Sequence, residues 1–164
     1  MNILPPNNKL SLLVTEEFLD IIKEDYIEML ELCKTPMGNM GGAYAISNQQ
    51  VSDTPFKFFV IRESGRVICN PEIINHTKTT VDSEEYCLTF FMEREPVIVQ
   101  RWNVIEVKFQ ELIASGLIEK TETLRGKEAR VWQHELDHCN GELIYDKDSD
   151  VWKAYVKFNE LNKK

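Results

Sequence analysis

The chain has 164 residues and a formal net charge of -8, with 43% hydrophobic and 28% charged residues. This composition is ordinary for a globular protein and excludes a disordered chain, and the length predicts one compact domain that buries its core without disulfides. The acidic balance leaves no basic stripe that could neutralise a phosphate backbone, so direct nucleic-acid binding is not expected.

The cysteines indicate a reducing compartment. Cys33, Cys69, Cys87 and Cys139 form no CxxC pair, and no pattern typical of a signal peptide precedes them. No apolar run approaches the roughly 20 residues that a membrane span needs. We therefore expect a cytoplasmic protein without a membrane partner.

The first predicted element is an amphipathic helix over residues 15–33. Its apolar residues recur at three- and four-residue spacing, and Thr15 is placed to cap its start. Residues 34–42 then collect one proline and three glycines, which predicts a loop.

Five short segments rich in β-branched and aromatic residues follow, and each predicts a strand. They are residues 56–61, 66–69, 86–91, 97–99 and 104–109. Ser64 and Gly65 predict a hairpin turn between the first two. Residues 75–77 read as a glycosylation sequon without a secretory context, and we expect a loop there.

Two more helices are predicted in the last third of the chain. The first covers residues 126–140, and Gly141 is placed to end it in a left-handed conformation. The second covers about residues 150–162 and has four apolar side chains roughly along one face. No repeat or linker interrupts this pattern, which favours a single domain over residues 1–164.

His134, Glu135 and His138 form an HExxH pattern on the predicted helix 126–140. Residues at i and i+4 of a helix point the same way, so two imidazoles can share one ion with the glutamate beside it. The alternative is a pair of hydrogen-bonded histidines without a metal. Because two of only three histidines in the chain have this spacing, metal binding is favoured. The predicted fold class is α+β, with short antiparallel strands around this central helix and a helix near each end.

A catalytic metal site needs a third protein ligand and an open position for water. Cys87, in the sequence Glu-Tyr-Cys-Leu-Thr of residues 85–89, is the candidate, because a thiolate is a good ligand for iron, zinc or nickel. The alternative is a buried thiol that packs like a small apolar side chain. Position alone leaves both interpretations open.

Several segments together resemble the peptide deformylase family. Residues 133–138, Gln-His-Glu-Leu-Asp-His, resemble that family's Gln-His-Glu-x-Asp-His motif, and residues 85–89 resemble its Glu-Gly-Cys-Leu-Ser motif. Residues 70–73, Asn-Pro-Glu-Ile, match a further segment of the family. The order and spacing of these motifs and the chain length also agree with the family.

The glycine-rich motif of the family, Gly-x-Gly-x-Ala-Ala-x-Gln, is the least preserved. It can be laid on residues 43–50 to end at Gln50, or moved back by one residue to end at Gln49. We prefer Gln50, because this register keeps small residues at three of the motif's small positions. The lost glycines leave the local backbone shape open, and Tyr86 in place of a glycine leaves the width of the pocket open.

The resemblance implies a metal-dependent hydrolase that removes the formyl group from N-formylmethionyl peptides, giving formate and a free N-terminal methionine. It implies Cys87, His134 and His138 as metal ligands and Glu135 as the general base that accepts a proton from the attacking water. Iron(II) is the metal implied, and zinc(II) or nickel(II) would also suit these ligands.

The same resemblance assigns the other parts of the site. The side-chain amide of Gln50 and the backbone N–H of Leu88 would stabilise the developing oxyanion. Tyr44, Ile46 and Val131 are candidates for the apolar slot that takes the methionine side chain, and Ala45 is a further substrate-binding candidate.

Arg101 resembles an arginine of the family that lies near the bound peptide, and the alternative for it is a solvated charge at a strand end. The expected partners are nascent N-formylmethionyl peptides and the ribosome, and we expect a monomer.

Two other functions compete with this prediction. A general zinc metallopeptidase also uses HExxH but draws its third ligand from downstream, where Glu142 and Asp146 are the available acids. A binding module that kept the fold and lost catalysis would explain Tyr86, Thr89 and the degraded glycine motif. Against it, all three ligand candidates and Glu135 are present.

Overall fold

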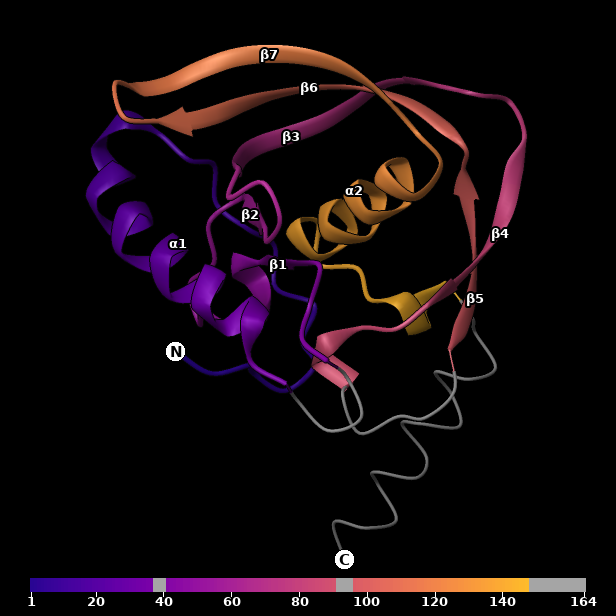
Figure 1. Cartoon of the computed structure of the whole chain (residues 1–164), viewed down its shortest axis with the longest axis horizontal. Helices are drawn as coiled ribbons and strands as arrows, with labels where there is room; N and C mark the ends of the chain where they lie inside the picture. The colour runs from indigo at the N-terminus through magenta and orange to yellow at the C-terminus, as the bar shows by residue number, and fades with distance from the viewer. Residues whose placement is uncertain (37–40, 91–95, 148–164) are drawn as a thin grey trace, which may run out of the picture.

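The computed structural model describes residues 1–36, 41–90 and 96–147. It has helices and antiparallel sheet in one mixed arrangement (Figure 1), so the predicted α+β class is confirmed. A five-stranded sheet has the order β1-β2-β3-β6-β7, and β4 pairs with β5 in a separate two-stranded sheet. The strands are β1 Ala45–Ser47, β2 Phe58–Ile61, β3 Val67–His76, β4 Thr80–Glu85, β5 Val97–Trp102, β6 Val104–Ile113 and β7 Gly116–Arg125. The helices are α1 Leu19–Lys34 and α2 Gly126–Cys139.

Helix α1 confirms the predicted amphipathic helix and packs on strands β1 and β2. Ile22, Met29 and Cys33 are fully buried in a core cluster with Phe58 and other residues of the sheet. Ile21, which belongs to the predicted apolar stripe, is instead 50% exposed. Thr15 makes no side-chain cap, because a short 3-10 turn over Glu16–Phe18 precedes the helix.

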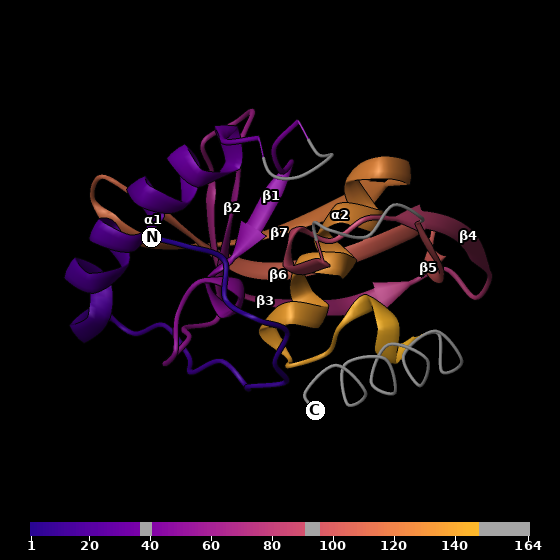
Figure 2. The same ribbon diagram turned by 90° about the horizontal axis from the view of Figure 1, so that it is seen from below.

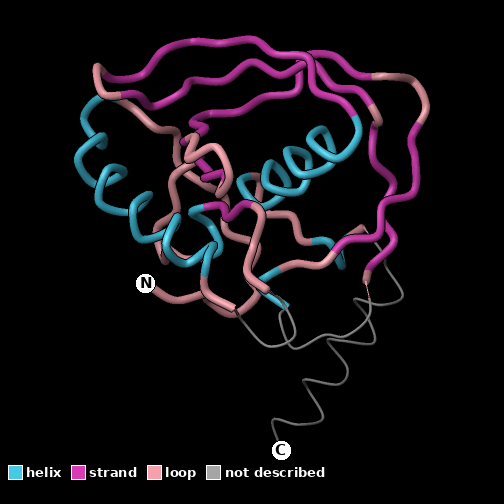
Figure 3. The backbone as a smooth tube through the Cα atoms, viewed as in Figure 1, coloured by secondary structure: helices cyan, strands magenta, loops and turns pink. Residues whose placement is uncertain are grey.

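The hairpin of β6 and β7 and the adjacent β3 form a long arch across the top of the molecule (Figure 3). The predicted strands were too short here, and the predicted loop at residues 75–77 was wrong at its first two residues, which end β3. Pro71 cannot donate to a ladder, but the register of β3 against β6 shifts between Cys69 and Glu72, where a proline is tolerated. Strand β7 was missed because its exposed residues are all polar, namely Glu119, Thr121, Thr123 and Arg125.

Helix α2 lies beneath this arch, and its residues Ala129 and Trp132 are buried in the second core cluster. The Trp132 ring meets Phe59 and Phe109 edge-on, with ring centroids 5.1 and 4.9 Å apart. Gly141 has φ +73° and donates its N–H to the carbonyl of His138 over 3.0 Å, which confirms the predicted left-handed end of the helix.

The sheet of β4 and β5 stands at the other end of the molecule from α1 (Figure 2). The predicted strand at residues 86–91 was wrong, because β4 ends at Glu85 and Leu88–Phe90 form a 3-10 turn. The true strand is polar, and its buried side chains are Ser83 and Glu85. The apolar residues that predicted a strand belong to the turn that follows β4, and Cys87 lies between β4 and that turn.

The predicted C-terminal helix at residues 150–162 lies outside the described residues. In the part of the chain that the structure describes, neither helix combines the length and the apolar character that a membrane span requires.

Candidate active site

The histidines of the HExxH pattern, in the second half of α2, lie close to Cys87. One possible ligand atom from each of Cys87, His134 and His138 lies within 4.8 Å of the other two. The Cys87 Sγ atom is 3.1 Å from His138 Nε2, and the two imidazole rings have centroids 5.0 Å apart. Cys87 and His138 are 3% and 1% exposed, so these groups face one another inside the protein.

This donor set fits a divalent metal ion. The Nδ1 atom of His134 is 2.8 Å from Glu85 Oε2, which leaves its Nε2 atom to face the cluster. Burial opposes ionisation of the Cys87 thiol, but the imidazoles of His138 and His134 outweigh it and hold its pKa well below the usual range. A thiolate and two imidazoles are ligands that iron, zinc and nickel accept.

Glu135 lies beside the cluster and is only 4% exposed. Its Oε2 atom is buried and has no hydrogen-bond partner among the described residues. Burial raises the pKa of this carboxyl group above its usual value, and the nearby His134 and His138 oppose that rise. A buried carboxyl group with a raised pKa and an unused oxygen can both accept and return a proton.

Of the two glutamines in the glycine-poor motif, Gln50 is the one beside Cys87. Its Nε2 atom is 3.6 Å from Cys87 Sγ and donates to Thr89 Oγ1 over 3.0 Å, while its Oε1 atom accepts the N–H of Ser47. The Gln49 side chain donates instead to the backbone carbonyl of Asn7 over 2.7 Å. The placement of the two side chains favours the register that ends at Gln50.

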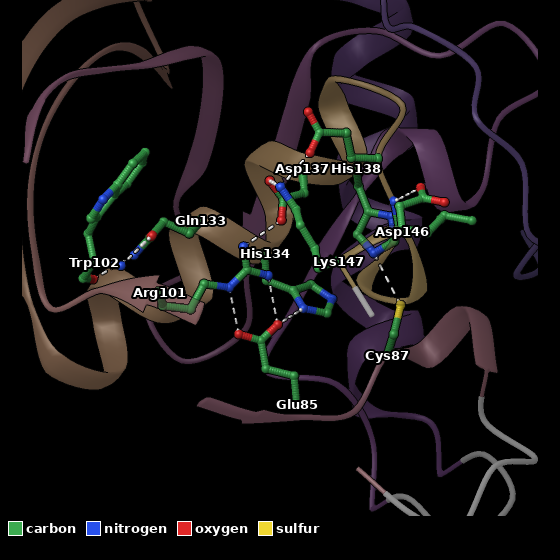
Figure 4. Close-up of polar contacts among 12 residues, drawn as sticks. Glu85, Cys87, Arg101, Trp102, Gln133, His134, Asp137, His138, Asp146 and Lys147 are labelled. Atoms are coloured by element: carbon green, nitrogen blue, oxygen red, sulfur yellow. Dashed lines mark hydrogen bonds and ion pairs between the residues drawn. The ribbon is translucent and has the colours of Figure 1, made fainter. Parts of the chain in front are cut away.

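Arg101 is buried between two carboxylate groups. It is 3% exposed and donates to both oxygens of Glu85 over 2.7 and 2.8 Å and to Asp137 over 2.5 Å (Figure 4). Burial opposes ionisation of Glu85, but the hydrogen bonds from Arg101 and His134 lower its pKa to about 2. The guanidinium group therefore holds the carboxylate that in turn orients His134.

Gln133 fixes α2 against the end of β5. Its side-chain amide accepts the N–H of Trp102 over 3.0 Å and donates to the Trp102 carbonyl over 2.8 Å, as a neighbouring strand would. This pair of bonds sets the position of the helix turn that carries His134.

A cavity of about 350 Å³ opens beside the cluster, between β1, the end of β4 and α2. Gln50, His134 and Glu135 line it, and Ala43, Ala45, Leu88 and Val131 give it an apolar wall. Ile46, another candidate for the methionine slot, is not among its lining residues. Successive strand residues point to opposite faces, and the Ile46 side chain is fully buried in the α1 cluster.

Sequence reasoning missed the roles of three side chains of this region, Glu85, Lys127 and Arg130, and left the place of Tyr86 open. Glu85 holds His134, and Tyr86, Lys127 and Arg130 line the cavity. Lys127 and Arg130 stand seven and four residues before His134 in the chain, a spacing that places all three on one side of a helix. That spacing was the available signal for the two cations, while Glu85 could be found only from its partners in space.

A sequence model of the polypeptide deformylase family matches residues 36–153. This chain belongs to the peptide deformylase family. The peptide deformylase of Thermotoga maritima is 38% identical over 106 residues, which are 62% of this chain and 60% of that relative. Peptide deformylase 2 of Bacillus anthracis is 40% identical over 80 residues, 47% of this chain and 41% of that protein. The alignments thus span less than two thirds of the length of these curated relatives.

Solved structures of the family agree over a longer part of the chain. The crystal structure of the Thermotoga maritima deformylase has a TM-score of 0.71 at 32% identity, covering 85% of this chain and 88% of that one. A Plasmodium falciparum peptide deformylase, solved with an inhibitor, has a TM-score of 0.71 at 24% identity over 96% of this chain and 94% of that one, and so shares the fold.

Proposed function

We propose that this chain is a metal-dependent peptide deformylase, which hydrolyses the formyl group of N-formylmethionyl peptides. The observation that carries the proposal is the cluster of Cys87, His134 and His138 beside the buried Glu135, at the wall of a cavity with an apolar side. Membership of the family supports the reaction class, and the residues in the cavity supply the groups that the reaction needs.

Cys87, His134 and His138 would hold one divalent ion, and we propose iron(II), with zinc(II) or nickel(II) as the alternatives for the same ligands. Such an ion, when bound, supplies Lewis acidity that makes water more acidic and polarises a carbonyl group. Glu85 holds the Nδ1 atom of His134, so Nε2 is the atom of this ring that would bind the ion.

Groups that line the cavity account for the proton transfers and for the stabilisation of the negative charge that develops on the formyl oxygen. Glu135 accepts a proton from the attacking water, which adds to the formyl carbon. The Gln50 amide and the Leu88 backbone N–H donate to the oxygen that becomes negative. Glu135 then returns the proton to the leaving amine, and formate and a free N-terminal methionine result.

The apolar wall of Ala45, Leu88 and Val131 suits the methionine side chain. We propose that residues 1–164 act as one catalytic domain on nascent formylated peptides. The expected monomeric state, the expected contact with the ribosome and the expected cytoplasmic location stay predictions.

The downstream acids that a zinc metallopeptidase would use are engaged elsewhere. Asp146 Oδ2 accepts the N–H of Leu143 over 2.7 Å and the amide of Asn8 over 2.9 Å, and Glu142 forms an ion pair with Lys147 over 2.5 Å. The deformylase therefore has the better-supported ligand set.

The test compares formate release from formyl-Met-Ala-Ser by the wild type, Glu135→Gln and the matched control Glu128→Gln, all purified without oxygen. Glu128 lies on the same helix but does not line the cavity. Loss of a general base lowers kcat by at least about 100-fold, so we expect that loss in Glu135→Gln and wild-type rates in Glu128→Gln. Full metal loading without formate release by the wild type would favour the silent binding module.

A further inference from the structure

One side of α2 lines the cavity with charged as well as apolar residues. Lys127, Arg130, Val131 and His134 all face it, at spacings of three, four and seven residues. A helix rises about 1.5 Å per residue, so Arg130 lies roughly 6 Å and Lys127 roughly 10 Å along the axis from His134. The cations therefore stand at increasing distance from the reaction centre.

Neither cation forms an ion pair within residues 1–36, 41–90 and 96–147. The Lys127 Nζ atom lies 4.5 Å from the centroid of the Tyr44 ring, which also lines the cavity. This contact holds the ammonium group at the wall. Arg130 is half-buried, so its guanidinium group is in part withdrawn from bulk water.

None of the acids that line the same cavity is paired with either cation. Glu85 is bound to Arg101 and His134, and Glu135 is the proposed base. Only the exposed Glu84, on strand β4, remains as a free acid of the lining. Two cations without an ion-pair partner among the described residues therefore line the part of the cavity that lies away from the metal ligands.

We propose that Lys127 and Arg130 select N-formyl peptides with an acidic side chain at the second or third residue. The inference rests on the proposed function and names its substrate class. An extended peptide advances about 3.3 Å per residue, so the distances of Arg130 and Lys127 from His134 match the second and third residues of a peptide whose formyl group lies at the cluster. The side chain of the first residue, methionine, would then contact the apolar wall.

The test measures kcat/KM for C-terminally amidated formyl-Met-Ala-Ser, for its variants with Glu at position two or three, and for the same variants with Lys. An ion pair in a partly exposed site changes affinity by up to about fivefold, so we expect Glu to exceed Lys by about that factor and added salt to reduce the difference. Lys127→Met and Arg130→Met should each diminish the preference, measured as the ratio of kcat/KM for the Glu peptide to kcat/KM for the matching Lys peptide. Arg125→Met, which removes a cation that does not line the cavity, should keep the preference.

The outcomes separate this inference from the proposed function. Cleavage of the neutral peptide with equal kcat/KM for Glu and Lys variants would overturn the inference and leave the function intact. Absence of cleavage of every peptide by the metal-loaded protein would overturn the function, and the inference with it. Formyl-Met-Ala as free acid and as amide distinguishes a terminal carboxylate from a side chain, and a gain for the free acid alone would overturn the side-chain assignment.

Discussion

At the scale of single residues, the site depends on a buried charge that touches no reacting atom. Arg101 joins Glu85 of β4 to Asp137 of α2, and Glu85 joins this pair to His134. The arginine fork satisfies both oxygens of one carboxylate, which a single ammonium group would not do in the same geometry. Arg101 is therefore a positioning residue for a metal ligand.

Replacing Arg101 tests this role. Arg101→Met leaves two buried carboxylates without their partner, and breaking a buried ion pair of this kind costs about 3 to 5 kcal/mol of the free energy of unfolding. Arg101→Lys should keep most of the free energy of unfolding but should hold Glu85 less firmly, because one ammonium group cannot replace both hydrogen bonds of the guanidinium group. We therefore expect a clear loss of metal affinity with only a small loss of stability. Urea denaturation and metal titration of both variants measure the two effects. Wild-type metal affinity in a folded Arg101→Lys protein would contradict the positioning role.

The residues of the site differ in how far they could be predicted from the chain. The HExxH spacing places His134, Glu135 and His138 together wherever a helix forms, because the helix period is fixed. The link from Cys87 to them needed the family resemblance, since they are 47 or more residues apart in the chain. The buried surroundings of Ile46 and Arg101 could not be predicted from the chain, because strand alternation and buried pairing depend on neighbours that only the fold supplies.

At the scale of elements, the segment that leads into β1 forms one wall of the cavity and depends on one glycine. Gly42 has φ +102°, and a Cβ atom there would lie 2.4 Å from the carbonyl oxygen of Cys33, whose carbonyl also accepts the N–H of Ala43. Gly42 therefore lets the backbone pass close to the end of α1 before it enters β1.

Gly42→Ala should be destabilising while Gly41→Ala should not. The first change forces an alanine into a left-handed conformation against a backbone oxygen, which costs of order 1 to 3 kcal/mol. The second position has nothing within 4 Å of a new Cβ atom and serves as the matched control. Thermal unfolding of both variants gives the comparison, and equal midpoints would show that the close approach to Cys33 is not required.

The elements themselves were predicted unevenly, for physical reasons. Both described helices were found, since each has a repeating apolar face and α2 ends at a glycine with φ +73°. Strands β4 and β7 were missed because their residues are largely polar. Each is stabilised by pairing along its length with a neighbour, β5 or β6, and pairing cannot be read from one segment alone.

At the scale of the whole molecule, the site joins parts of the chain that pack in different clusters. Leu88 belongs to the cluster of α1, Cys87 to the cluster that includes Phe90 and Leu143, and α2 anchors in the cluster of Trp132. A metal ion bound by Cys87 and α2 would therefore tie these clusters together. Ligands that bind only the folded state raise its stability, so the metal-free protein should unfold at a lower temperature than the loaded protein.

The most direct measurement is a titration of the metal-depleted protein with iron(II) in the absence of oxygen, with formate release from formyl-Met-Ala-Ser measured at each step. The account predicts that activity rises in proportion to added metal and levels off at one equivalent per chain. It also predicts that Cys87→Ala neither binds this equivalent nor gains activity. Full activity in that variant, or an inactive wild type that has bound one equivalent, would contradict it.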